Sequence, residues 1–103
     1  MTTRVRVGQR VEDFIHSMAP QPRRAVWRAI KALAKHGGDV KRLEGKLAPY
    51  WRLRVGRVRV VYAVRAAHGE RQILCFFAGY RATVYAVVEQ LLASGLVEEL
   101  KEL

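Results

Sequence analysis

The stretch YWRLRVGRVRVVYAV, residues 50–64, has the pattern of a two-stranded β-hairpin. Apolar residues alternate with arginines on both sides of Gly56 and Arg57, and a two-residue turn that starts with glycine commonly joins two strands. A turn of this length sets the register, so Arg54 is expected to lie directly opposite Arg59. Residues opposite one another share a face of the sheet. The hairpin is therefore predicted to have one apolar face and one basic face.

The basic face needs an explanation, because like charges directly opposite one another destabilise a sheet by a few tenths to about 1 kcal/mol. Arginine offers a fork of donors that fits phosphate oxygens, so we interpret this face as a site for a nucleic-acid backbone. The alternative is a solubilising face that protects the sheet against aggregation. The apolar face consists of Trp51, Leu53, Val55, Val58, Val60 and Tyr62, and the basic face consists of Arg52, Arg54 and Arg59.

The sequence around the hairpin predicts an α+β fold. Alternating residues indicate short strands, and apolar residues at positions i, i+3, i+4 and i+7 indicate amphipathic helices. The helices are expected to pack on one face of a twisted, mostly antiparallel sheet. The predicted elements are an N-terminal strand at 3–7, a helical hairpin over about 11–36, a basic loop at 39–49, a meander of three antiparallel strands at 50–55, 58–65 and 71–79, a helix at 82–92 and an amphipathic tail at 93–103.

The length and charge of the chain restrict its partners. Its 103 residues predict a single domain spanning 1–103, with no apolar run long enough to cross a membrane and no signal-like N-terminus. The net charge is +10, and residues 41–81 contain ten basic side chains and two acidic ones. Such a charge attracts polyanions, namely nucleic acid, the ribosome or an acidic protein. We therefore expect a soluble cytoplasmic protein that does not bind a membrane.

Cysteine and histidine usage gives no sign of a cofactor. Cys75 is the only cysteine and lies in the apolar stretch ILCFF, so we expect a buried core thiol with no disulfide and no Cys-rich metal site. His16, His36 and His68 fall in a helix, at a helix end and in a turn, where structural or solvated roles are expected. No cofactor and no metal is predicted.

Further candidate site residues lie outside the basic face of the hairpin. Arg81 follows Gly79 at the end of a strand, where a charge can emerge at the rim of the sheet. Tyr85 lies about one helical turn later, on the flank of the apolar stripe of the last helix, and its alternative role is a buried structural tyrosine. Additional contacts with RNA or the ribosome are expected from Lys41, Arg42, Lys46 and Arg57.

On these residues the sequence resembles the RelE/ParE superfamily of toxins from type II toxin–antitoxin systems. The resemblance rests on YWRLRVGRVRVVYAV, a short turn, ILCFFAGYRATVY and a C-terminal helix, and it is strongest over residues 47–92. It implies the small RelE-like fold and, for the RelE branch, metal-independent cleavage of messenger RNA in the ribosomal A site. That branch uses basic residues of the sheet and an aromatic of the last helix. The residues that match these positions are Arg52, Arg54, Arg59, Arg81 and Tyr85.

The resemblance leaves the mechanism and the branch open. RelE often has lysines where this chain has Arg52 and Arg54, and an arginine in effect cannot lose its proton to act as a general base. Tyr85 is then either that base or a residue that stacks on or orients a nucleobase. The alternative functions are those of a ParE-type toxin, which poisons DNA gyrase and is not a nuclease, and of an RNA-binding domain without catalysis.

The resemblance also implies an acidic cognate antitoxin that binds the toxin in a hetero-oligomer. Without residues 97–103 the chain has 18 basic and 6 acidic residues, a net charge of +12. The tail GLVEELKEL, residues 95–103, has Leu96, Leu100 and Leu103 along one side and acids on the other. We expect this tail either to dock in a groove for which the antitoxin competes, or to be a frayed end.

Overall fold

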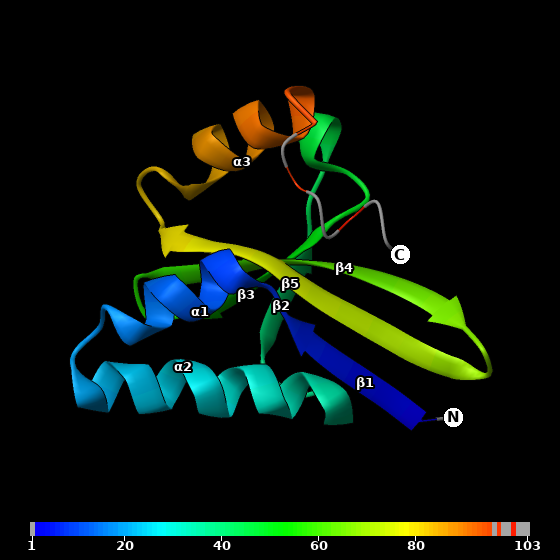
Figure 1. Cartoon of the computed structure of the whole chain (residues 1–103), viewed down its shortest axis with the longest axis horizontal. Coiled ribbons are helices and arrows are strands. Elements are labelled where there is room, and N and C mark those ends of the chain that lie inside the picture. Colours follow the sequence, from blue (N-terminus) through cyan, green and yellow to red (C-terminus); the bar gives the residue numbers. More distant parts are fainter. Residues whose placement is uncertain (1, 96, 98–99, 101–103) are drawn as a thin grey trace.

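The computed structural model describes residues 2–95, 97 and 100, and it confirms the α+β fold (Figure 1). Within this part of the chain no helix is long and apolar enough to cross a membrane. The strands are β1 (Thr2–Val7), β2 (Asp39–Arg42), β3 (Trp51–Val55), β4 (Val58–Ala67) and β5 (Glu70–Tyr80). The helices are α1 (Gln9–His16), α2 (Pro20–Ala32) and α3 (Val84–Ala93), with 3₁₀ turns η1 (Leu33–Lys35) and η2 (Gly45–Leu47).

The strands form one mixed sheet in the order β1-β5-β4-β3-β2. β1 runs parallel to β5, and the other neighbouring pairs are antiparallel. The predicted hairpin register is confirmed, because Arg54 lies opposite Arg59 across β3 and β4. Gly56, at the turn, has a φ of +58°, a left-handed conformation that glycine adopts without steric strain. The turn chemistry therefore sets which face each arginine occupies.

Helices cover both faces of the sheet, so the expectation of one covered face is wrong. α2 lies below the sheet in Figure 1 and α3 lies above it, and α1 shares one core cluster with α2. The reason is that β4 and β5 carry apolar residues on both faces, and both must be shielded from water. The core toward α1 and α2 includes Val11, Ile15, Val26, Ile30, Leu53, Val60, Tyr62, Ile73 and Cys75, and the core toward α3 includes Val61, Ala63, Leu74, Phe76, Val84 and Val88.

The segment predicted as a loop at 39–49 contains an additional strand. Residues 39–42 form β2, which pairs antiparallel with β3 and places Lys41 opposite Arg52. All four residues of β2 are exposed, so this edge strand has no hydrophobic alternation from which it could be predicted. Its pairing with β3 holds two of the expected RNA-contacting residues, Lys41 and Arg42, against the hairpin.

Two described residues after α3, Val97 and Leu100, belong to the core beneath that helix. Val97 is buried and Leu100 is half-buried, and both contact the apolar cluster that includes Phe76. These two residues therefore extend the core toward α3. The other two leucines predicted for the apolar side of the tail, Leu96 and Leu103, lie outside the described residues.

Candidate functional site

A pocket of about 360 Å³ lies where β2, the β3–β4 hairpin and the start of α3 meet. It contains four of the five residues predicted to be catalytic and two of the four predicted to contact RNA. The sheet and the helix thus bring together residues that are far apart in the sequence. We call it the basic pocket, and its lining residues are Lys41, Arg42, Leu43, Glu44, Arg52, Arg59, Arg81 and Tyr85.

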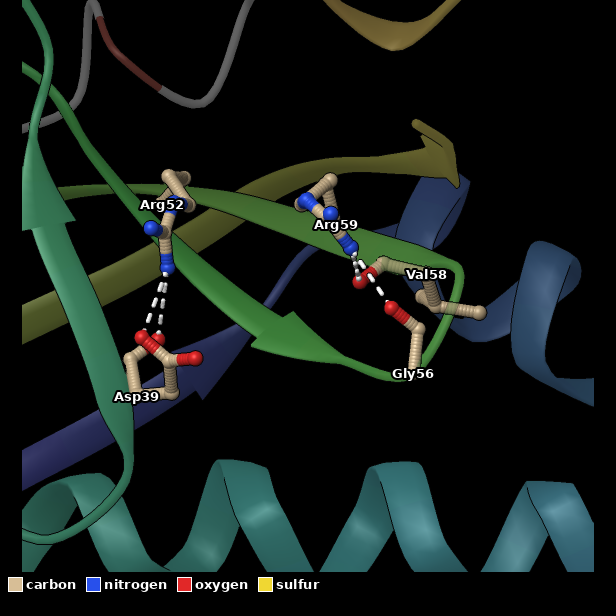
Figure 2. Close-up of polar contacts among 5 residues, drawn as sticks. All are labelled: Asp39, Arg52, Gly56, Val58 and Arg59. Atoms are coloured by element: carbon tan, nitrogen blue, oxygen red, sulfur yellow. Dashed lines mark hydrogen bonds and ion pairs between the residues drawn. The ribbon is translucent and has the colours of Figure 1, made fainter. Parts of the chain in front are cut away.

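Arg52 is held in the basic pocket by its neighbour on β2. Its Nη1 donates to a carboxylate oxygen of Asp39 at 3.1 Å and to the main-chain carbonyl of Asp39 at 3.0 Å (Figure 2). The Arg52 side chain is only 15% exposed, so this ion pair is partly shielded from solvent. Anchoring through one nitrogen orients the guanidinium and leaves its other N–H donors for a ligand.

Arg59 has a structural role that the sequence did not predict. It is 8% exposed, and its Nη1 donates to the main-chain carbonyls of Gly56 at 2.8 Å and Val58 at 3.0 Å (Figure 2). These bonds satisfy a buried cation, which is otherwise costly to remove from water, and they fix the hairpin turn. The same guanidinium borders the basic pocket. Arg59 therefore connects the geometry of the turn with the charge of the pocket.

Arg81 and Tyr85 reach the pocket from the segment that joins β5 to α3. The backbone N–H of Arg81 donates to the carbonyl of Arg57 at 2.9 Å, which ties this segment to the hairpin turn. Tyr85 lies in the first turn of α3, half-buried against the core beneath that helix. Val84, at the start of α3, is buried in the same core and lies close to Gly79 of β5.

Three of the predicted site residues do not line the basic pocket. Arg54 is exposed on β3, beside the pocket. Arg57, at the hairpin turn, lines a neighbouring hollow together with Arg81. Lys46 lies on η2, where its Nζ forms a solvent-exposed ion pair with Glu89 of α3 at 3.5 Å. These residues add to the positive surface around the pocket, and their roles stay predictions.

Two acidic residues of the site were missed from the sequence. Asp39 orients Arg52, and Glu44 is the one acid among the residues of the described chain that line the basic pocket. Glu44 is placed there because the Leu43 N–H donates to the carbonyl of Tyr50 at 2.9 Å, which continues the pairing beyond β2. No sequence signal identifies either acid, since both depend on the unpredicted strand.

The basic pocket has the chemistry of a phosphodiester site. Guanidinium donors from β3, β4 and the segment before α3 surround one space, and donors fixed in advance stabilise negative charge that develops on a bound group. Tyr85 adds an aromatic ring on which a nucleobase can stack. Among the described residues, no group of three or more His, Cys, Asp or Glu side chains is placed to hold a metal ion. The arginines of the pocket therefore have the chemistry to bind an anion.

Cys75 lies elsewhere, in the core toward α1 and α2. It is fully buried, and burial raises the pKa of its thiol to about 12. A thiol with this pKa stays protonated near neutral pH and is a poor nucleophile. The expected core role of Cys75 is therefore confirmed.

Solved structures of toxins share this fold. The toxin–antitoxin complex RelBE2 from Mycobacterium tuberculosis matches with a TM-score of 0.67 and 20% identity, over 79% of this chain and 100% of that chain. The archaeal RelE–RelB complex from Pyrococcus horikoshii matches with a TM-score of 0.59 and 26% identity, over 79% and 97%. The YoeB/ParE toxin from Agrobacterium tumefaciens matches with a TM-score of 0.58 and 21% identity, over 76% and 98%.

The similarity is carried by the fold. No protein-family profile matches the sequence, and no curated protein does. The three structures are nevertheless covered over nearly their whole length. The resemblance to the RelE/ParE superfamily is thereby confirmed at the level of the fold.

Proposed function

We propose that this chain, which has the RelE/ParE toxin fold, is the toxin of a type II toxin–antitoxin system and cleaves messenger RNA on the ribosome. The observation that carries the proposal is the convergence of Arg52, Arg59, Arg81 and Tyr85 on the basic pocket. The residues implied by the resemblance are scattered over 34 positions of the sequence, from 52 to 85. Because these residues line one pocket, the arrangement supports a nuclease more than a basic face that only keeps the protein soluble.

The proposed reaction uses the 2′-hydroxyl of the RNA itself as nucleophile. Its oxygen bonds to phosphorus as the bond from phosphorus to the 5′-oxygen breaks, so the transition state resembles a phosphorane with additional negative charge. Cations placed in advance stabilise that charge more than they stabilise the bound substrate. We assign this role to Arg52, Arg59 and Arg81. The reaction then needs only a base for the 2′-hydroxyl proton and a proton donor for the 5′-oxygen.

Glu44 and Tyr85 are the candidates for the general base. Arginine is excluded because it stays protonated. Glu44 is the one acid among the described residues that line the pocket and offers carboxylate oxygens as acceptors, whereas a half-buried tyrosine ring at the pocket wall is suited to stacking on a base. We therefore assign proton transfer to Glu44 and positioning of the nucleobase to Tyr85. Alignment of the 2′-hydroxyl with the scissile bond accounts for much of the remaining rate.

The proposed partners follow from the charge and from the neighbours. RelBE2 is a toxin–antitoxin complex, and the archaeal RelE is in a complex with RelB. A chain with a net charge of +10 would attract an acidic antitoxin as well as ribosomal RNA. We propose that the chain forms a hetero-oligomer with such an antitoxin in the cytoplasm and acts on the ribosome when it is released.

A second candidate is a ParE-type toxin that inhibits DNA gyrase and cleaves no RNA. The observation that favours it is the state of Arg59, which is buried and bonded to two main-chain carbonyls. An arginine used to fix a turn has fewer donors left for a phosphorane. The remaining pocket cations would then form a binding surface and not a catalytic site.

The test is messenger-RNA cleavage in a translating extract, mapped by primer extension. Wild type is compared with Arg81→Ala and with Arg24→Ala, which removes the same charge from the exposed surface of α2. We expect cleavage by wild type and by Arg24→Ala, and a loss on the order of 100-fold for Arg81→Ala. If wild type leaves the messenger intact but inhibits gyrase supercoiling, the ParE-type function is correct. Full cleavage by Arg81→Ala would refute the assigned mechanism.

A further inference from the structure

A second pocket, of about 190 Å³, lies on the opposite face of the sheet from the basic pocket. It is formed where η1 and the residues after it meet the strands, close to the C-terminal end of α2 (Figure 1). The function proposed above does not use it. We call it the η1 pocket, and the lining residues that the argument uses are Leu33, His36, Val40, Trp51, Tyr62 and Arg71.

Arg71 brings an unpaired cation to this pocket. It lies on β5, in register with Thr3 of β1 and Ala66 of β4. Its Nη1 is buried, and none of the described residues accepts a hydrogen bond from it. The neighbouring acid, Glu70, forms an ion pair with Arg4 at 3.6 Å instead. A buried donor without an acceptor destabilises a fold, so an acceptor that is not part of the described chain is expected here.

Tyr62 adds a second donor beside Arg71. The tyrosine is 2% exposed, and burial raises the pKa of its hydroxyl above the usual value, while the charge of Arg71 acts to lower it. The Tyr62 hydroxyl is therefore neutral, and it lies close enough to the Arg71 guanidinium to interact with it electrostatically. A neutral phenol and a guanidinium together present O–H and N–H donors to one ligand.

Apart from the His36 side chain and Gly37, the other walls of the pocket are apolar. Trp51 stacks on Tyr62, with ring centroids 6.4 Å apart and planes inclined by 17°, and Leu33 and Val40 contribute aliphatic surface. No acid is among the residues that line the pocket in the described chain. Hydrogen-bond donors on one side and hydrocarbon on the other fit an organic ligand, in which the accepting group is attached to a carbon chain. That description matches a carboxylate better than an inorganic anion, which has no apolar part.

We propose that the η1 pocket binds a carboxylate, which pairs with Arg71 and accepts a hydrogen bond from Tyr62 while its carbon chain lies against Trp51. The carboxylate is supplied either by an acidic side chain of a protein partner or by a small free organic acid. The proposal does not depend on nuclease activity, because the sheet separates this pocket from the basic pocket.

The first experiment measures binding through Trp51 fluorescence in a Trp27→Phe background, where Trp51 is the one remaining tryptophan. The probes are isobutyrate and the peptide acetyl-Leu-Glu-Leu-amide, with acetyl-Leu-Gln-Leu-amide as the neutral control. We expect a saturable change with at least one carboxylate probe and none with the neutral peptide. Binding of isobutyrate identifies a free acid as sufficient, and binding of the Glu peptide alone identifies a protein side chain.

Two outcomes of this titration would overturn the proposal. One is the absence of saturation with either carboxylate probe at a constant ionic strength. The other is binding of inorganic phosphate as tight as that of the better carboxylate, because the ligand class assigned here would then be wrong.

The second experiment tests the role of Arg71. Arg71→Met should weaken the better carboxylate probe at least about tenfold, since hydrogen bonds to charged groups are among the strong ones. The melting temperature of the unliganded protein should be unchanged or higher, because an unpaired buried donor has been removed. Arg28→Met, which removes the same charge from the exposed surface of α2, should keep its affinity within about twofold of wild type.

Arg71→Lys keeps the charge and loses the fork of donors, so it provides a test even if Arg71→Met unfolds. We expect a folded protein with an affinity between those of wild type and Arg71→Met. Equal affinity for wild type, Arg71→Lys and Arg28→Met would show that Arg71 does not hold the ligand, and the proposal would fail.

Discussion

The two faces of the sheet come from the same strands but are built for different purposes. Toward α1 and α2, the side chains of β3 and β4 are apolar and closed over by two helices. Toward α3, the same strands carry Arg52, Arg54 and Arg59, and one short helix covers only the part of the face around Phe76. The uncovered part is where the basic pocket lies. A sheet face can therefore be part core and part binding site when its covering helix is shorter than the strands.

The largest effect is expected in the core beneath α3. Phe76 is fully buried and packs edge-on against Tyr50, with ring centroids 5.1 Å apart. Phe76→Ala should lower the free energy of unfolding by about 3–5 kcal/mol, since it removes buried area and leaves a cavity. Urea denaturation measures this. A decrease of less than about 1 kcal/mol in the free energy of unfolding would mean that the face toward α3 is not well packed, and the contrast between the two faces would not hold.

Replacing Arg59 should separate its two roles. Arg59→Ala should reduce messenger-RNA cleavage about 100-fold and also lower the free energy of unfolding, because two carbonyls of the turn lose a donor. Cleavage assays and denaturation are measured on the same preparations. Arg59→Lys is the matched control, and it should recover stability more than activity, because lysine lacks the fork. Equal recovery of both properties would indicate that Arg59 acts only through the turn.

Removing residues 96–103 should destabilise the α3 face alone. Val97 is buried beneath α3, and a fully buried valine contributes about 1.5–3 kcal/mol. The truncated chain should lose about that much stability and change its affinity for the antitoxin, which calorimetry measures. Val97→Ala in the full chain is the control for the apolar contact. If both the stability and the antitoxin affinity stay within error, the tail plays no part.

Salt should weaken RNA binding at the basic pocket. If Lys41, Arg42 and Arg81 each contact one phosphate of a single strand, affinity should fall about twentyfold between 50 and 200 mM salt. Fluorescence anisotropy with a short labelled RNA gives the slope. The slope should decrease in Lys41→Ala and stay constant in Arg24→Ala. A flat dependence in the wild-type protein would point to an apolar partner for this face.

The smallest effect is expected at the ion pair between Lys46 and Glu89, which joins η2 to α3 at the surface. Both side chains are largely solvated, so Lys46→Ala should change stability by less than about 1 kcal/mol. Thermal unfolding measures this, with Lys35→Ala on the exposed end of η1 as a reference. A loss of 2 kcal/mol or more would mean that α3 depends on this bond rather than on its apolar contacts.

The sequence predicted the hairpin well because two local rules agree there. The glycine-led turn sets the register, and the alternation assigns Leu53 and Val60 to one face and Arg52 and Arg59 to the other. The central part of the site follows from this pairing. Arg81 and Tyr85 were predicted from their places after the last strand and on the last helix, and the resemblance matched both to catalytic positions. The bond from the Arg81 N–H to the carbonyl of Arg57 ties this segment to the hairpin, and both residues line the same pocket.

What could not be predicted depends on contacts between distant segments. β2 is an exposed edge strand that is held in the sheet by its pairing with β3. The local sequence does not predict this pairing, so it did not predict that Asp39 and Glu44 lie at the site. The helix on the second face was missed for another reason, since the continuous apolar run of β5 is typical of a strand buried on both faces, but it does not identify which segment covers each face. The bonds of Arg59 to the turn depend on burial, which periodicity does not predict.

The parallel pairing of β1 with β5 determines when the molecule can assemble during its own synthesis. Residues 2–7 leave the ribosome before the other strands, yet their partners, residues 70–75, lie in the strand that is made last. β1 must therefore wait unpaired while about two thirds of the chain is translated, and such non-local pairing delays folding.

We expect ribosome-bound chains that stop at residue 65 to stay protease-sensitive, and chains that include α3 to become resistant, when each carries a linker that clears the exit tunnel. Early resistance at residue 65 would contradict this order. Under the function proposed above, the chain would complete its fold only after most of it has been synthesised, and this delay would give an antitoxin time to bind it before it reaches a ribosome.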